Sequence, residues 1–325
     1  MAELVRAGEI LFARGDLSTA ADLLHEALQR ARGSHLPTAQ AQALLLLAEI
    51  DRHRGRYRDA FPRLHEALAL LPEISDARIQ ARILLLAGLN DLALGELEMA
   101  CQRFSEAHQV YRSLGRPDEL RQILTHLGSL STTMGAYEQA ERWLRESLAF
   151  AEAEANPAAI AQTLANLGEV QRLQNRFDEA RRTFEAALEL FTKAGLEPET
   201  LMIENDLGHV NGAARRLRDA LRHYRRAFQI AARLDLAAHM VDTLAGLIVV
   251  LIAAGHTPRA LETAGYLLRH PSFTSDIERY FRPVLQPLLA DTGLPFTAGV
   301  EDPPIPMIIE ETLQFLEQSL TLSTG

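Results

Sequence analysis

The histidines, carboxylates and single cysteine are the residues of this chain most capable of chemistry, and their spacing is the first test for an enzyme. His25 and His65, each followed by glutamate, match the first half of the HExxH motif, in which two helical histidines four residues apart bind zinc. Gln29 and Ala69 stand where the second histidine belongs. No two of the 11 histidines are four residues apart. The sequence therefore predicts no metal site.

The remaining catalytic and cofactor motifs are also missing from the sequence. Cys101 is the one cysteine, so the chain forms no internal disulfide and has no CxxC motif, which fits a reducing compartment. It follows Ala100 on an apolar helix face, which is typical of a small core residue. Neither the GxxxxGK[ST] phosphate loop nor the GxGxxG dinucleotide turn occurs. We therefore expect no cofactor and a protein that is not an enzyme.

One dense basic segment runs from residue 215 to residue 226 and contains six arginines. Arg218, Arg222 and Arg225 share one helix face, on which nucleic acid or an acidic partner could dock. The alternative interpretation is a solvated outer helix face. The net charge, 33 − 43 = −10, favours the second interpretation and makes nucleic acid an unlikely partner.

The composition predicts a helical protein with a sizeable core. Hydrophobic residues make up 47% and charged residues 23%, while aromatics are only 6%, which disfavours a β-sandwich or barrel. The first residues contain no apolar signal-peptide core, and the longest apolar run, Leu244 to Ala254, is too short to span a bilayer. We expect a soluble, cytoplasmic protein with no membrane partner.

A forty-residue repeat determines how these residues are positioned. An alanine recurs without insertion or deletion at positions 20, 60, 100, 140, 180, 220 and 260. A second column of small residues lies twelve positions upstream of these alanines. It runs from Gly8 to Gly208, and only the seventh repeat has a large residue, Ile248, at this position. Two antiparallel helices approach closely where side chains are small, so we expect each glycine on the first helix of a repeat (the A helix) opposite the alanine on the second (the B helix). A large apolar residue follows each alanine by four positions, on the same face.

Turn residues mark the helix boundaries. Gly15 and its equivalents follow the A helices, where a left-handed C-terminal cap favours glycine. Pro37, Pro117 and Pro157 mark the starts of the next A helices, and Asn156 is placed to cap the helix at 157. The sequence thus predicts an all-α fold: seven helix–turn–helix units stacked into a right-handed solenoid.

These columns resemble the tetratricopeptide repeat. Its pattern is Leu-Gly, then Gly-x-Tyr/Phe/Leu-x-x-Ala, then a large apolar residue and a small one. Leu167-Gly168, Phe177, Ala180 and Phe184 form the clearest copy, and the resemblance covers about residues 1 to 270. A forty-residue period is similar to the long-helix repeats of kinesin light chains and of sensor regions in bacterial regulators. The stretch from 259 to 291 resembles the end of such regions in signal-transduction ATPases and in LuxR- or SARP-type regulators, so a fragment of a larger regulator is one interpretation.

The resemblance implies that A helices line a concave groove and B helices the convex side. A-helix positions not used for A–B packing would then face a ligand, a peptide or protein segment. Asn166 matches the Asn-Leu-Gly of long-helix repeats, whose asparagines hold the backbone of an extended peptide. The candidate groove residues are Gln42, Glu49, Arg52, Gln122, Thr125, His126, Ser129, Gln162, Asn166, Glu169, Arg172, Asn205 and His209.

The chain divides, by this pattern, into four parts. Seven repeats occupy 1–272, a capping helix 273–293, a Pro-rich linker 294–306 and an amphipathic tail helix 307–325. The helix at 308–320 could occupy an apolar groove near Val249 and Ile252 of its own chain, which would be autoinhibitory. The leading hypothesis is a non-catalytic interaction scaffold that binds a peptide in the concave groove. The alternative is the effector-sensing module of a bacterial regulator.

Overall fold

The computed structural model describes residues 2–272 and 303–322, and every regular element in these two ranges is a helix. The prediction of an all-α fold of stacked helix pairs is confirmed. The expected capping helix at 273–293 and most of the linker at 294–306 lie outside the described residues. The chain falls into two compact units, Met1–Glu154 and Ala155–Gly325.

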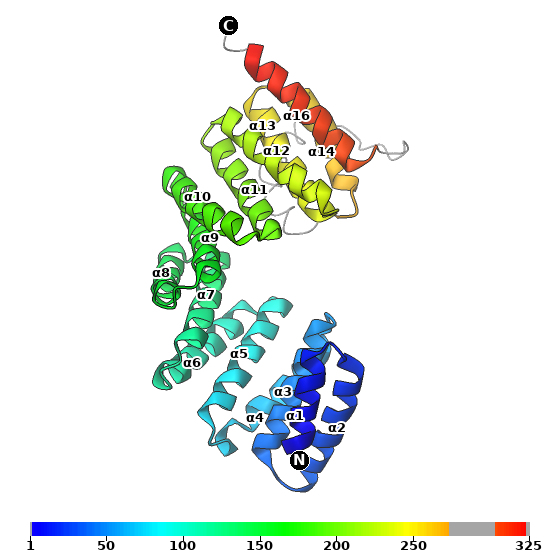
Figure 1. The fold of residues 1–325 in the computed structure, drawn as a ribbon, viewed down its shortest axis with the longest axis vertical. Helices are drawn as coiled ribbons and strands as arrows, with labels where there is room; N and C mark the ends of the chain where they lie inside the picture. Colours follow the sequence, from blue (N-terminus) through cyan, green and yellow to red (C-terminus); the bar gives the residue numbers. More distant parts are fainter. Residues whose placement is uncertain (1, 273–302, 323–325) are drawn as a thin grey trace. The chain divides into compact units, whose positions relative to one another are not determined.

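The first unit contains four helix pairs, each packed against the next (Figure 1). Adjacent A helices also touch, as α1 does with α3 and α3 with α5. A short 3₁₀ helix, Leu71–Glu73, interrupts the second repeat after its B helix. The helices are α1 (Ala2–Ala13), α2 (Leu17–Gly33), α3 (Pro37–His53), α4 (Tyr57–Ala69), α5 (Ala77–Leu94), α6 (Leu97–Ser113), α7 (Pro117–Thr133) and α8 (Tyr137–Ala153).

The second unit contains three helix pairs and a further helix from the end of the chain. In this unit α11 contacts both α9 and α13, so the A helices again form one continuous face. The helices are α9 (Pro157–Leu173), α10 (Phe177–Ala194), α11 (Glu197–Ala213), α12 (Leu217–Arg233), α13 (Ala237–Ala253), α14 (Thr257–Arg269) and α16 (Ile305–Leu322). No described helix is both long and apolar enough to cross a membrane.

The helix ends follow from local residue chemistry. The Asn156 side chain accepts a hydrogen bond from the Ala159 N–H at 3.1 Å, which confirms the predicted cap. Gly135 after α7 has φ = 76°, in the left-handed region that glycine adopts without strain. At the same position of later repeats, Asn175 and Arg215 also have positive φ, 59° and 58°. The turn geometry is therefore kept even where the sequence lacks glycine.

The glycine column has a different partner from the one expected. All seven column alanines are fully buried, but the glycines of the A helices face the large residue four positions after the alanine. A Cβ added at Gly128 would lie 2.6 Å from Leu144, and one at Gly208 would lie 2.4 Å from Tyr224. The expected glycine–alanine pairing is thus wrong. Glycine makes room for a bulky B-helix side chain, and the fully buried alanines are a separate column of the core.

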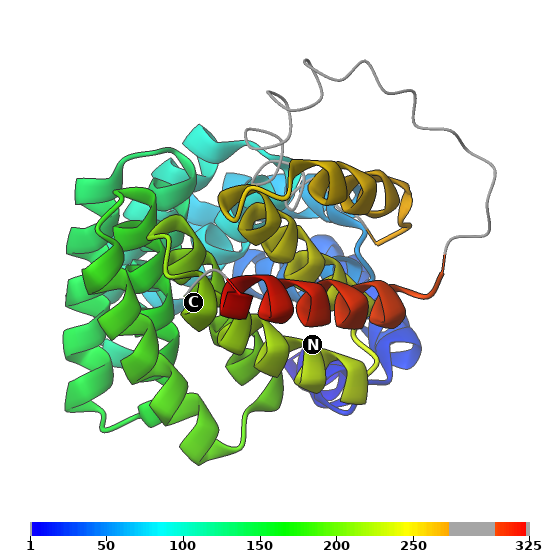
Figure 2. The ribbon, with the colours of Figure 1, turned by 90° about the horizontal axis from the view of Figure 1, so that it is seen from above.

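Helix α16 lies alongside α12 and α13 in the second unit (Figures 1 and 2). Ile309, Leu313 and Leu316 are fully buried in the apolar cluster of this unit. On α14, Arg259 stacks over the Phe315 ring at 4.2 Å. Helix α16 thus contacts α12, α13 and α14. The predicted position of this helix beside Val249 and Ile252 stays a prediction.

Candidate partner-binding surface

In the first unit, polar residues of α3 bridge to the neighbouring A helix. The Glu49 carboxylate lies 3.4 Å from the Arg82 guanidinium of α5, and Arg52 Nη1 donates to Asn90 Oδ1 at 3.4 Å. Gln42 is half-buried on the same helix. Burial lowers the pKa of Arg52, which nevertheless stays charged near neutral pH. Glu49 and Arg52 therefore both contact the neighbouring A helix, α5.

The four candidates on α7 divide into two groups. Gln122 is exposed, and the other three are half-buried. The Thr125 hydroxyl shares a 2.9 Å hydrogen bond with Ser147 of α8. The His126 ring stacks on Phe104 of the preceding B helix, with centroids 5.5 Å apart. Burial, with a smaller effect of the Arg52 charge, lowers the pKa of His126 and keeps the ring neutral.

On α9 of the second unit, the candidate residues present charge to solvent. Glu169 accepts two parallel hydrogen bonds from Arg172, from Nε and from Nη2, each 2.6 Å long. The Glu169 side chain remains 37% exposed. Gln162 is exposed and Asn166 half-buried. A fixed ion pair with polar neighbours is an arrangement that can orient a peptide backbone or a charged side chain.

The two candidates on α11 are buried, and their polar atoms connect helices. Asn205 Nδ2 donates to Asp242 Oδ2 at 3.0 Å, and the Thr243 hydroxyl donates to Asn205 Oδ1 at 2.9 Å. His209 Nδ1 lies 2.9 Å from the Tyr224 hydroxyl, and its Nε2 lies 3.6 Å from Asp242. These residues support the surface from beneath, and Asp242 is the member that reaches solvent.

Asp206 is a third carboxyl of this surface, and it holds its proton more tightly than an ordinary aspartate. Burial raises its pKa to about 7, the charges of Glu169 and Asp242 add to the shift, and His209 and Arg172 oppose it. Asp242 is not among the groove residues that the sequence predicted. The repeat could have identified it, because residue 242 lies two periods after Gln162, at the same A-helix position.

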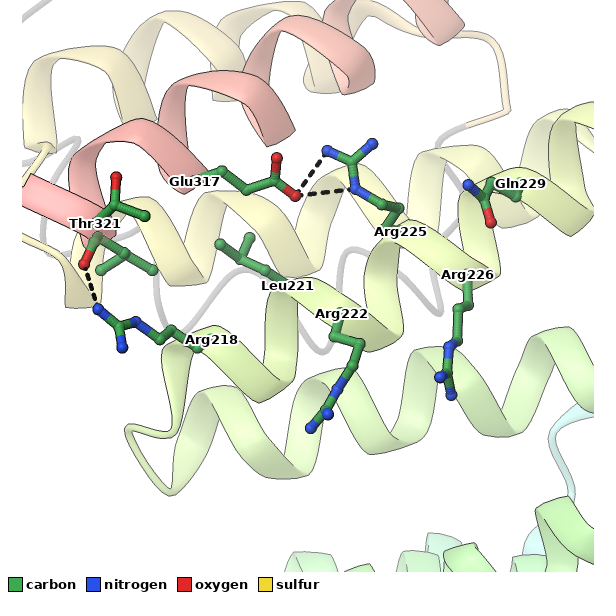
Figure 3. Close-up of a pocket in the computed structure, with 9 residues that line it drawn as sticks. Arg218, Leu221, Arg222, Arg225, Arg226, Gln229, Glu317 and Thr321 are labelled. Atoms are coloured by element: carbon green, nitrogen blue, oxygen red, sulfur yellow. Dashed lines mark hydrogen bonds and ion pairs between the residues drawn. The ribbon is translucent and has the colours of Figure 1, made fainter.

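The arginines of α12 point to two sides of the helix (Figure 3). Arg225 Nε donates to Glu317 of α16 at 2.9 Å, and Arg218 Nη2 donates to the Leu320 carbonyl at 2.9 Å. Both line a pocket of about 570 Å³ between α12 and α16. Arg226 points away from α16, towards Glu204 of α11 at 3.6 Å. The basic segment is therefore not a uniform solvated face, because part of it holds the tail helix.

Comparisons with known proteins agree with the helix-pair architecture. The family model described as tetratricopeptide repeat matches residues 79–153 and 159–263. The chain matches no curated protein.

Several solved structures share the fold. RapI in its apo form is 15% identical, with a TM-score of 0.69 and coverage of 88% of this chain and 100% of that one. A second structure is a signal-transduction ATPase with numerous domains from Pyrococcus horikoshii, which has a tetratricopeptide repeat sensor. It is 16% identical, with a TM-score of 0.67, and the match covers 89% of this chain and 43% of that one. A Rap protein complexed with competence and sporulation factor is 12% identical, with a TM-score of 0.56 and coverage of 89% and 98%.

Proposed function

The chain belongs to the tetratricopeptide repeat family, and we propose that it is a non-catalytic scaffold that binds a peptide or protein segment along its A-helix faces. The observation that carries this proposal is the cluster on α9, α11 and α13. There Glu169, Arg172 and Asp242 are held at the surface by hydrogen bonds and ion pairs. Side chains fixed before binding lose little entropy on binding.

In the first unit the A-helix face has a more apolar character. Leu85, Leu89 and Leu92 of α5 are half-buried and form a stripe, and Glu49 with Arg82 lies across the α3–α5 contact. An apolar stripe bordered by charge suits a segment that alternates apolar and polar side chains. The fold similarity to a Rap protein complexed with a factor supports partner binding, without identifying the partner.

A charge swap tests the proposal. In the double variant Glu169→Arg with Arg172→Glu, the two side chains can still pair within α9, but the charge pattern on the surface is reversed. We expect partners captured by the full chain from native lysate to fall roughly tenfold in abundance, because complementary charges become repulsive. Quantitative mass spectrometry of the captured proteins measures this.

The matched control is the double variant Glu189→Lys with Lys193→Glu. These residues form an exposed ion pair four residues apart on α10, a B helix of the same unit, with a nitrogen–oxygen distance of 2.6 Å. This swap should leave capture unchanged. Equal capture by both double variants would contradict binding at the A-helix face.

The alternative function is an effector-sensing module. The fold shared with the tetratricopeptide sensor of a signal-transduction ATPase favours it, and this chain matches 43% of that protein's length. A sensor of small effectors should gain thermal stability from a compound, because a ligand that binds only the folded state stabilises it. A thermal-shift screen with the full chain distinguishes this function from a scaffold, which responds to protein segments only.

A further inference from the structure

The connection between α3 and α4 carries a second arginine-rich segment, which we call the arginine turn. Residues 52–58 contain no acidic residue and four arginines: Arg52, Arg54, Arg56 and Arg58. Arg52 is half-buried, and the other three are exposed. None of these four side chains forms an ion pair with a residue in the described ranges 2–272 and 303–322. The arginine turn therefore presents accessible positive charges that no described carboxylate pairs with.

Arg52 has an equivalent in the fifth repeat whose charge is satisfied within the protein. This equivalent is Arg172, three periods later, which donates two parallel 2.6 Å hydrogen bonds to Glu169. The corresponding glutamate of the second repeat, Glu49, lies instead against Arg82 of α5, at 3.4 Å. The same Glu–Arg pair is thus closed in the fifth repeat and open in the second.

Arg56 stands directly before α4, and the fifth and sixth repeats also carry arginine at this position. There Arg176 pairs with Glu179, and Arg216 pairs with Asp178. Arg56 forms no ion pair within the described part of the chain. The second repeat therefore leaves open, at two positions, a charge that the fold pairs with a carboxylate elsewhere.

A pocket of about 480 Å³ lies between the arginine turn and the end of α5. Arg56 and Arg58 contribute two positive charges to its lining, and Asp59 contributes one negative charge. Tyr57 and Leu94 add apolar surface. The pocket thus combines a net positive charge with apolar walls.

The Arg52 side chain is held in place next to this pocket. Its guanidinium carbon lies 5.4 Å from the centroid of the Tyr57 ring, and its Nη1 donates to Asn90 Oδ1 at 3.4 Å. These contacts fix the guanidinium before a partner binds, so little side-chain entropy is lost on binding.

Helix α4 also exposes two aromatic rings beside the arginine turn. Among the large hydrophobic side chains that are exposed in the described residues, the aromatic ones are Tyr57 and Phe61, at 36% and 45%. They are four residues apart and therefore lie on one face of α4. Tyrosine, phenylalanine and arginine are enriched in protein interfaces, and tyrosine and arginine are among the residues that contribute most to binding. This composition indicates an interaction surface.

We propose that the arginine turn and the exposed face of α4 form a second docking surface, which binds an acidic segment of a partner protein. Carboxylates of the segment pair with Arg52, Arg56 and Arg58, because the guanidinium fork matches a carboxylate. Apolar side chains of the segment pack on Tyr57 and Phe61. The net charge of −10 and the apolar part of the surface favour a protein over a nucleic acid. This surface is separate from the proposed A-helix face, because α4 is a B helix.

A selection of random twelve-residue peptides displayed on phage tests this inference. It is run in parallel on the full chain and on the double variant Arg56→Gln with Arg58→Gln, whose side chains are exposed and whose loss leaves the core intact. Peptides that bind the full chain but not the variant should contain aspartate and glutamate at least about three times as often as the starting library. If no peptide depends on these arginines, or if the dependent peptides are not acidic, the proposal is overturned.

A fluorescently labelled peptide from this selection locates the contacts by anisotropy. Arg52→Gln and Phe61→Ser should each weaken its binding at least about fivefold. Arg182→Gln removes an exposed arginine from α10, another B helix, and is the matched control that should leave affinity unchanged. Circular dichroism verifies that each variant is folded. Equal losses in the control and in Arg52→Gln would mean non-specific charge attraction and would refute the assignment.

A labelled twenty-nucleotide RNA strand is the competing ligand in the same assay. The RNA should bind more weakly than the selected peptide, and tighter RNA binding that is lost in the double arginine variant would overturn the assignment to a protein partner. The charge swap at Glu169 and Arg172 leaves the arginine turn unchanged, so it should not affect the selected peptide. The docking surface and the A-helix face can therefore fail independently.

Discussion

At the scale of single residues, Tyr224 shows how the repeat packs its large side chains. It is 1% exposed and lies against two glycines, Gly208 of its own repeat and Gly246 of the next. Its hydroxyl reaches His209 at 2.9 Å, so the ring also orients a residue beneath the candidate surface. The ring packs in this position because neither glycine carries a Cβ.

Gly208→Ala should therefore destabilise the protein. The new Cβ would lie 2.4 Å from Tyr224 Cε1, and the ring cannot shift away because Gly246 is packed on it as well. We expect the free energy of unfolding in urea to fall by about 2–3 kcal/mol. Gly33→Ala is the control, since nothing lies within 4 Å of its added Cβ, and it should not lower stability. Equal effects of the two substitutions would show that the close approach does not matter.

Asp206 makes stability depend on pH. Its pKa is about 7 in the folded chain, against an ordinary value of 3.8, so the folded state holds the proton more tightly than the unfolded state. The stabilisation from this group is complete below pH 4, is lost as pH rises to about 7, and does not change above that. Asp206→Asn should remove this loss. We expect its free energy of unfolding at pH 8, relative to pH 4, to be higher by about 4 kcal/mol than that of the unmodified chain, because each unit of pKa shift corresponds to about 1.4 kcal/mol.

The test uses the difference in free energy of unfolding between the Asp206→Asn variant and the unmodified chain, measured at each pH. The pKa values of His108 and His126 are lowered by burial, so these groups add stability as pH rises towards 6.5 and oppose the effect of Asp206. Both histidines are present in the variant, so their contributions cancel in the difference. Parallel pH profiles for the two proteins would contradict the raised pKa of Asp206.

At the scale of elements, α12 joins two different environments. On one side Arg225 and Arg218 bind α16. On the other side Arg222, together with Arg216 directly before the helix, lines a polar pocket of about 410 Å³ to which α10 and α11 also contribute. The i, i+4 pattern of arginines predicted one common face. Long side chains diverge from a helix, however, and each turns towards the neighbour that supplies an acceptor (Figure 3).

The docking of α16 depends on its apolar face. Leu313→Ala should lower the free energy of docking by about 2–4 kcal/mol, because the side chain is fully buried. Hydrogen exchange at residues 305–322 should accelerate accordingly, while exchange in α9 and α10 stays unchanged. Met307→Ala, at a side chain 53% exposed, is the matched control and should have little effect. Faster exchange across the whole second unit would instead mean that α16 is an integral part of its core.

At the scale of the whole molecule, the repeat predicted most of the fold and only part of the candidate site. The forty-residue period identified each helix pair, and the cap at Asn156 and the left-handed turn at Gly135 were predictable because they depend on neighbours within one turn. The placement of Thr125 and His126 against neighbouring helices was not predictable. A position in the helical repeat indicates the direction in which its side chain points. Whether that side chain reaches solvent depends on the size of the residue that faces it on the neighbouring helix.

The sequence by itself therefore determined the class of fold, the register of its helix pairs and its family, because these follow from periodic, local patterns of residue size and turn chemistry. Only the tertiary structure decided that the glycines face large side chains, that Asn205 and His209 bind Asp242 and Tyr224, and that Asn211 lines an arginine-rich pocket. These features depend on distances between side chains 15 to 38 residues apart on different helices. Such distances are set by how the helices pack, which no local pattern specifies.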